Sequence, residues 1–248
     1  MDKALYVAMT GAKHNMQAQT AHANNLANIN TTGFKADFAQ ARSMPVLYGD
    51  GHPTRAYALA ESPATDFTQG ALVETGRELD IAIKGEGFIA VQAPDGTEAY
   101  TRAGSLFIDS VGMLRTGSGL PVLGNGGPIA LPAAEKIEIA VDGAITVMPL
   151  GQGVDAPVQA DRIRLVNPPL DSIKRGESGL IVALNLEEEI PADANVRVIS
   201  GFVEASNVNA VNELTSVLSL ARQYEMQVKI MQTVKENSET SASLLRVS

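Results

Sequence analysis

The sequence predicts an α+β protein in which long N- and C-terminal helices pair as a coiled-coil-like layer, with a central, mostly antiparallel β domain between them along the chain. All 12 prolines and 19 of the 22 glycines fall within residues 45–191. By contrast, residues 1–32 contain only Gly11, and residues 202–248 contain neither glycine nor proline. Because both residue types interrupt helices, two helical ends flank a body of strands and turns.

We expect four parts along the chain. They are an N-terminal helix over residues 1–35, an extended connector over 36–70, a β-rich outer domain over 71–201 and a C-terminal helix over 202–248. The connector is expected to be extended because three prolines divide it.

The N-terminal segment carries apolar residues at heptad spacing. Steps of four and three residues alternate through Leu5, Met9, Ala12, Met16, Gln19, Ala23 and Leu26. Only Gln19 in this series is polar. This spacing places a narrow apolar stripe along one helix face, which is typical of helices that pack side by side.

The C-terminal segment has the same pattern. Its series is Ala210, Leu214, Val217, Ala221, Tyr224, Val228 and Met231. Asn207 or Asn209 can cap its start. A helix from there to the end of the chain is about 60 Å long, more than a compact body can cover. A helix pair within one chain is the simpler alternative, but Leu218 and Leu220 widen the stripe, so we expect packing on neighbouring copies as well.

Short strands separated by turns are predicted through the middle of the chain. Alternating segments flank three hairpin turns, at residues 94–96, 109–112 and 142–143. Further strands are expected at residues 79–83, 163–166, 180–184 and 196–200. Frequent short strands of this kind favour an antiparallel sandwich or an open barrel.

Charge and composition exclude several classes of partner. The net charge is −9, to which residues 1–35 contribute +2, residues 202–248 contribute −1 and the middle contributes −10. Without a basic stripe, neither nucleic acid nor an anionic membrane surface is expected as a partner. The absence of cysteine excludes disulfides, thiolate metal sites and cysteine nucleophiles. No apolar run approaches the ~20 residues of a membrane span, and the first residues make a poor Sec signal.

Cofactor and metal motifs give no candidate. The Gly-Glu-Gly at residues 85–87 matches half of a dinucleotide fingerprint, but a strand follows it, so no helix N-terminus is available for a phosphate. His14 and His22 lie eight residues apart on the expected helix, too far to share a metal alone, and we expect both to be exposed. His52 lies in the connector. We therefore expect no cofactor, no metal and no small-molecule substrate.

One acidic cluster keeps an enzyme as an alternative. Glu74, Glu78, Asp80 and Glu86 lie close in sequence, and glycoside hydrolysis needs two carboxyl groups. Aromatic platforms for sugars are few, since aromatic residues make up 4% of the chain. We expect solvated turns and strand edges here, with an envelope-polymer hydrolase as the alternative. A fibrous adhesin is a third possibility and would need a Sec signal.

Three blocks of sequence resemble the flagellar rod and hook family of axial proteins. "ANNLANINTTGFK" at residues 23–35 is similar to the N-terminal signature of that family. Residues 79–124 resemble its central block, with Gly-x-Gly-Phe, Tyr-Thr-Arg-x-Gly and D-x-x-G-x-L. Residues 201–231 resemble its C-terminal block, including Glu204 and Glu213. The short connector and the tail favour a proximal-rod subunit, with a distal-rod or other axial subunit as the alternative.

The resemblance implies a structural protein of the periplasm-spanning flagellar rod, not an enzyme. It implies export through the flagellar type III pathway without a cleaved signal, and self-assembly of the terminal helices into a tubular drive shaft that transmits torque for motility. The implied partners are other rod proteins, copies of the same chain and the export apparatus. The expected assembly residues are Leu5, Met9, Ala12, Met16, Asn24, Asn25, Leu26, Asn28, Gly33, Phe34, Asn207, Leu214, Val217, Ala221, Tyr224, Val228 and Met231.

The asparagine-rich end of the first helix fits such an assembly. A helix can stop at Gly33 in the left-handed conformation, and Phe34 can anchor the chain as it leaves. One such residue is enough for a stop, yet the stretch has four asparagines. We therefore expect Asn24, Asn25 and Asn28 to bond to neighbouring backbones where subunits meet, because each amide both donates and accepts.

Overall fold

The protein is described by a computed structural model that covers residues 3–38, 41–46, 55–60, 64–149, 157–176, 178–185 and 190–247. It divides into two compact units. The first, which we call the helical unit, comprises Met1–Ile29, Ala36–Asp66 and Val208–Ser248. The second, the β unit, comprises Asn30–Lys35 and Phe67–Asn207.

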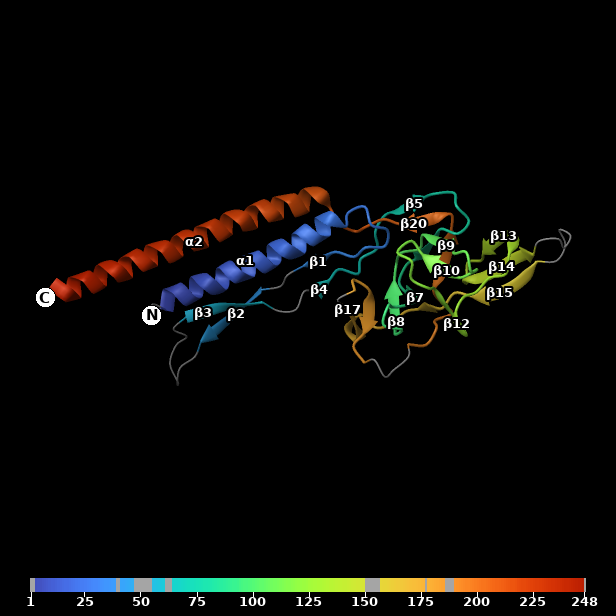
Figure 1. The fold of residues 1–248 in the computed structure, drawn as a ribbon, viewed down its shortest axis with the longest axis horizontal. Helices are drawn as coiled ribbons and strands as arrows, with labels where there is room; N and C mark the ends of the chain where they lie inside the picture. Colours follow the sequence, from blue (N-terminus) through green and yellow to red (C-terminus); the bar gives the residue numbers. More distant parts are fainter. Residues whose placement is uncertain are drawn as a thin grey trace. The chain divides into compact units, whose positions relative to one another are not determined.

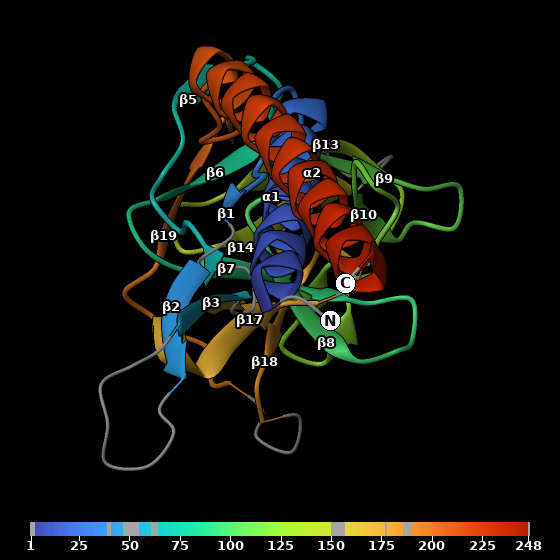
Figure 2. The same cartoon turned by 90° about the vertical axis from the view of Figure 1, so that its left-hand side faces the viewer.

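Two long helices lie side by side in the helical unit (Figures 1 and 2). They are α1 (Lys3–Ala27) and α2 (Ala210–Val247). Gly11 approaches Gln227 and His22 bonds to Glu213, so the helices run antiparallel. Since α2 has 38 residues and α1 has 25, the C-terminal turns of α2 extend past the start of α1 (Figure 1).

The end of α1 differs from the sequence expectation, whereas the cap of α2 is one of the two that were expected. α1 ends at Ala27, six residues before Gly33. Two caps were possible for α2, and the structure selects Asn209, whose side-chain oxygen accepts the backbone N–H groups of Val211 (3.0 Å) and Asn212 (3.2 Å). Such a cap satisfies donors that have no partner within the helix.

The described part of the helical unit also contains four short strands. They are β1 (Asp37–Phe38), β2 (Ala41–Val46), β3 (Arg55–Ala60) and β4 (Ala64–Thr65). β1 pairs with β4 and β2 pairs with β3, both antiparallel, and β3 also contacts α1. The segment for which an extended connector is expected therefore pairs with itself, because extended backbone must find hydrogen-bond partners.

The β unit consists of short antiparallel strands. They are β5 (Leu72–Glu74), β6 (Ile81–Lys84), β7 (Phe88–Gln92), β8 (Glu98–Thr101), β9 (Leu106–Ile108), β10 (Leu114–Thr116), β11 (Leu123–Gly124), β12 (Gly127–Pro128), β13 (Ala134–Ile139), β14 (Ala144–Pro149), β15 (Val158–Arg162), β16 (Leu165–Val166), β17 (Ile173–Arg175), β18 (Ile181–Ala183), β19 (Arg197–Ser200) and β20 (Phe202–Glu204), with the 3-10 turn η1 at Leu170–Ser172. The largest sheet has the order β16-β7-β8-β18-β17, and another has the order β13-β14-β15. β19 pairs with β6, and β20 with β5.

All three predicted hairpins are confirmed, as β7–β8, β9–β10 and β13–β14. Asp109 organises the second, because one carboxylate oxygen accepts the N–H groups of Val111 and Met113 and the other accepts Arg115 Nε at 2.6 Å. The hydrogen bond from Arg115 holds the pKa of Asp109 below its ordinary value. The D-x-x-G-x-L motif is thus a turn motif here.

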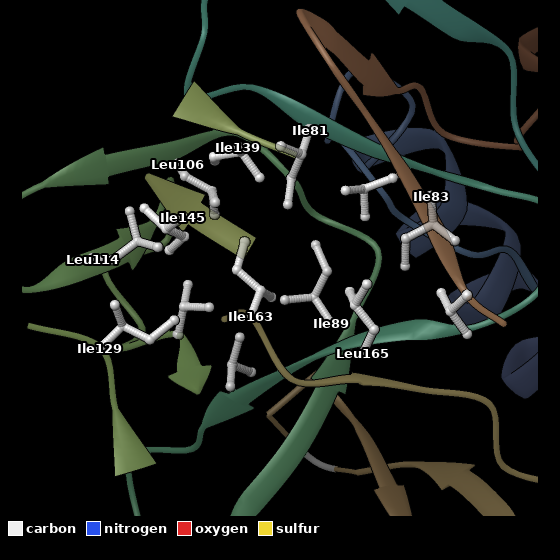
Figure 3. Close-up of a cluster of buried hydrophobic side chains, with 14 of the residues drawn as sticks. Ile81, Ile83, Ile89, Leu106, Leu114, Ile129, Ile139, Ile145, Ile163 and Leu165 are labelled. Carbon is white, nitrogen blue, oxygen red and sulfur yellow. The ribbon is translucent and has the colours of Figure 1, made fainter. Parts of the chain in front are cut away.

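The larger of the two described clusters of buried side chains in the β unit is aliphatic, as the scarcity of aromatic residues predicts (Figure 3), and the other includes Phe88 and Tyr100. Isoleucines and leucines from many strands point toward one another, among them Ile81, Ile89, Leu106, Leu114, Ile145 and Ile163. The segment at residues 79–83 is buried more completely than its alternation suggests, since Asp80 and Ala82 are buried as well as Ile81 and Ile83. Both faces of β6 are therefore covered.

Candidate functional site

Three buried charged side chains meet in the β unit. Glu204, Lys35 and Arg102 are 0%, 1% and 4% exposed, and we call them the ionic cluster. Lys35 Nζ lies 2.6 Å from Glu204 Oε1, and Arg102 Nη1 lies 3.0 Å from Glu204 Oε2. Each carboxylate oxygen therefore accepts a charged donor.

Backbone groups complete the ionic cluster. The N–H of Gly70 donates to Glu204 Oε1 at 3.0 Å, and Lys35 Nζ donates to the carbonyl of Thr68 at 2.6 Å. Arg102 Nη2 donates to the carbonyl of Gly85 at 2.8 Å. Charge-assisted hydrogen bonds of this kind are about twice as strong as neutral ones.

Burial makes the three charges depend on one another. A buried ion is stable only if its charge is paired and its hydrogen-bonding groups are satisfied. Removing one partner of a buried ion pair destabilises a protein by roughly 3–5 kcal/mol, because the other charge is left unpaired in the interior. The ionic cluster is thus a place where single substitutions have large effects.

The segments that carry Lys35 and Glu204 are also bonded through their backbones. The N–H of Gly33 donates to the carbonyl of Glu204 at 2.7 Å, and the N–H of Asn207 donates to the carbonyl of Phe34 at 3.4 Å. The segment that leaves α1 and the segment that leads to α2 are therefore held together on the β unit.

Arg175 fixes the leaving segment from another side. Its guanidinium lies over the ring of Phe34, with Cζ 4.5 Å from the ring centroid, and Nη2 donates to the carbonyl of Lys35 at 2.6 Å. Stacking of arginine on an aromatic face adds a cation–π attraction to packing. Phe34 thus anchors the chain as it leaves α1, as expected.

Gly33 has a positive φ of 68°, as the sequence predicts, but the stop of α1 is not its role. A Cβ atom at this position would lie 2.2 Å from the backbone carbon of Arg102, far inside van der Waals contact. Glycine therefore lets the leaving segment pack directly on the backbone beside Arg102.

The ionic cluster brings together one residue from each block on which the family resemblance rests. Lys35 closes the N-terminal block, Arg102 lies in Tyr-Thr-Arg-x-Gly, and Glu204 lies in the C-terminal block. The Gly-x-Gly-Phe motif also takes part, since Gly85 accepts a bond from Arg102 and the ring of Phe88 lies 5.3 Å from the Arg102 guanidinium carbon. The three blocks are thus parts of one structural site.

Comparison with known proteins matches the same three blocks of sequence. Three family models match in order, described as "Flagella basal body rod protein" over residues 5–35, "Flagellar hook protein FlgE/F/G D1 domain" over 82–147 and "Flagellar basal body rod FlgEFG protein C-terminal" over 199–244. "Flagellar basal-body rod protein FlgF" of Escherichia coli (strain K12) is 39% identical, with both chains covered in full. The chain belongs to the flagellar basal-body rod family.

Other rod proteins match over similar lengths. FlgF of Salmonella typhimurium is 37% identical and covered in full, as is this chain. The rod protein FlgG of Bacillus subtilis is 32% identical, over 99% of this chain and 100% of its own length. These relatives are structural rod proteins, so this member of the family is a structural protein and not an enzyme.

The asparagines at the end of α1 make hydrogen bonds within the chain. Asn25 is buried; its Nδ2 donates to the carbonyl of Asp37 at 2.6 Å and its Oδ1 accepts the Asp37 N–H at 2.9 Å. Asn28 Nδ2 donates to the side-chain oxygen of Asn24 at 2.7 Å. Asn25 therefore fastens β1 to the end of α1, a use that a run of asparagines in sequence does not reveal.

The first heptad series of this rod protein is only partly buried along α1. Ala12 is buried, whereas Met9 and Met16 are 48% and 62% exposed. The buried residues of α1 are the alanines Ala8, Ala12 and Ala18 together with Asn15 and Asn25. Within one chain, the seven positions of the series therefore do not form a single buried stripe.

The second series divides in the same way. Val217, Ala221, Val228 and Met231 are partly buried, whereas Leu214 and Tyr224 are exposed. Leu214 lies with Val211 and Leu218 at i, i+3 and i+7 spacing, and all three are at least 49% exposed. At 100° per residue, this stripe lies on the side of α2 opposite Glu213 and Gln227, which meet α1.

The histidines and acidic residues of this rod protein form no catalytic or metal site among the described residues. His22 Nδ1 lies 2.5 Å from Glu213 Oε2, so this side chain joins the two helices, and the expectation that it is exposed is wrong. Glu74, Glu78 and Glu86 are exposed, whereas Asp80 is buried beside Arg77. No group of three metal-binding side chains occurs in the described ranges, and His52 lies outside them. No described helix is long and apolar enough to cross a membrane.

The fit of Gly33 can be tested against a matched glycine. We expect Gly33→Ala to destabilise the protein far more than Gly76→Ala, because both residues have φ near 70° but only the Cβ of residue 33 meets other atoms. The strained φ alone costs about 1–3 kcal/mol in either variant. Urea unfolding of the two variants measures the difference, and equal losses would contradict the close approach to Arg102.

The role of Asn25 can be tested in the same way. We expect Asn25→Ala to lower the free energy of unfolding by about 1–3 kcal/mol, because it removes from a buried side chain both hydrogen bonds to the backbone of Asp37. Asn24→Ala is the control, since Asn24 is exposed on the same helical turn. Urea unfolding again measures the free energy of unfolding of both variants. Equal losses would contradict the claim that the bonds of Asn25 to Asp37 stabilise the folded chain.

Proposed function

We propose that this chain is a subunit of the proximal rod, which assembles through its terminal helices, with copies of itself and other rod proteins, into a tubular shaft that transmits torque. The family supports a place in the rod. The FlgF relatives from Escherichia coli and Salmonella typhimurium, which match at higher identity than the Bacillus subtilis FlgG, support the proximal position. A distal-rod position is the alternative.

The observation that carries assembly through the helices is the exposed stripe on α2. Val211, Leu214 and Leu218 are 68%, 49% and 59% exposed on the face turned away from α1. Contiguous apolar surface on a single chain marks an interaction site. Its burial in an assembly contributes roughly 25 cal/mol per Å² of apolar area removed from water.

α1 has a stripe of the same kind. Tyr6, Met9 and Met16 are exposed on the side of α1 opposite Gly11 and His22, which meet α2. The two helices of one chain thus offer apolar faces in two directions, as a layer of helices requires. In this proposal they pair as a coiled-coil-like layer, with small residues between them and large residues turned to neighbouring copies.

Membership of the rod family supports the remaining parts of the proposal. The terminal helices form the inner layer of the tube, and the β unit forms its outer part. The assembly residues expected from the sequence lie between Leu5 and Phe34 and between Asn207 and Met231. We propose that those whose side chains make no described contact within the chain contact neighbouring subunits. The subunit reaches the periplasm-spanning rod through the flagellar export apparatus without a cleaved signal.

An aspartate on the α2 stripe should block assembly but leave the single chain folded. We expect Leu218→Asp, and likewise Leu214→Asp, to abolish motility and incorporation into basal bodies, because a buried unpaired carboxylate costs several kcal/mol, roughly. In the free chain, where these positions are exposed, each substitution should change the free energy of unfolding by no more than about 0.5 kcal/mol.

Ser219→Asp is the matched control, with the same charge one residue further along α2 and away from the apolar stripe. Basal bodies purified from each strain are assayed for the subunit. Normal incorporation of Leu218→Asp would contradict the proposal that this stripe is buried between subunits.

A further inference from the structure

We propose that the ionic cluster is a latch that docks the leaving and returning segments of the chain on the β unit together, so that neither segment stays docked without the other. The three segments of the latch are residues 33–35, 68–70 and 204–207. Its role in the rod, which rests on the proposed function, is to share load between these segments.

The three segments form a closed set of contacts. Lys35 Nζ joins the first to the second through Thr68, and the N–H of Gly70 joins the second to the third through Glu204. The third returns to the first through the N–H of Gly33 on the Glu204 carbonyl, and through the N–H of Asn207 on the Phe34 carbonyl. Each segment is therefore held by both of the others.

The position of the latch along the chain gives it this role. The chain passes between the helical unit and the β unit at four points, after residues 29, 35, 66 and 207. Three of these points lie within two residues of a latch segment. A pull on any of these three connections therefore reaches the latch before it reaches the aliphatic core.

Charge makes the latch cooperative. One carboxylate, Glu204, faces two buried cations, Lys35 and Arg102. Arg102 in turn is fixed to the β unit through the carbonyl of Gly85 and the ring of Phe88. If Glu204 loses its charge, Lys35 and Arg102 face each other without a counter-charge in a buried site, so the effect reaches both neighbouring segments.

Amide hydrogen exchange on the full-length chain tests the latch. Glu204→Gln keeps the size of the side chain but replaces one acceptor oxygen with a donor group. We expect exchange at least tenfold faster at the amides of Gly33, Gly70 and Asn207 together. The amide of Gly70 bonds to the Glu204 side chain, whereas the amides of Gly33 and Asn207 bond to the backbone carbonyls of Glu204 and Phe34. Faster exchange at Gly70 alone would overturn the latch and leave a local contact.

The control is Glu138→Gln, which removes the charge from an exposed ion pair with Lys136. It should leave all three amides unchanged. Lys35→Met is a milder variant that leaves Glu204 bonded to Arg102 and Gly70, and it keeps the test open if Glu204→Gln fails to fold. It too should speed exchange at Asn207, and slow exchange there would overturn the latch.

A double variant tests whether the charges act as one unit. We expect the loss in urea midpoint for Lys35→Met with Glu204→Gln to be clearly smaller than the sum of the two single losses, because residues in one network are not additive. Additive losses would overturn the latch. All these measurements use the purified chain, so they stand even if the protein were absent from basal bodies, a result that would refute only the proposed function.

Discussion

The burial of one carboxylate, that of Glu204, is the constraint on which the joining of the chain's parts depends. A fully buried negative charge is tolerated only with charged and hydrogen-bonded partners. Lys35 and Arg102, 169 and 102 residues away in sequence, supply the charges. The chain must therefore bring its N-terminal exit, a turn of its β body and its C-terminal return to one point, and Gly33 lets the backbones approach closely enough.

The helices show the opposite distribution of side chains from that of a soluble amphipathic helix. Small residues such as Ala8, Ala12 and Ala18 are buried, while large ones such as Met16 and Leu218 are exposed. In an isolated protein this arrangement leaves much apolar surface in water. In a layer of helices it allows close approach within a chain and large contacts between chains. In our proposal, the exposed faces of the helices serve assembly with other subunits, and the ionic cluster holds the parts of a single subunit together.

Sequence patterns predicted what depends on local chemistry. Hairpin turns, the positive φ of Gly33 and an asparagine cap on α2 all follow from neighbouring residues, and each is present. The heptad series could not show which of its residues are buried within one chain, because alanine, methionine and leucine are all apolar and fit the spacing equally well. The hydrogen bonds of Asn25 with Asp37 and of His22 with Glu213 depend on packing that no spacing encodes. The sequence blocks identified the family, but their meeting at Glu204 is a property of the fold.

The most direct test is a cryo-electron microscopy map of the basal-body rod in which the side chains of this subunit are resolved. We expect to find the subunit in the proximal rod, with Lys35 and Arg102 on the Glu204 carboxylate in every copy and the Val211–Leu214–Leu218 stripe covered by helices of neighbouring subunits. A map in which that stripe faces solvent, or in which Glu204 is separated from both cations, would contradict this expectation.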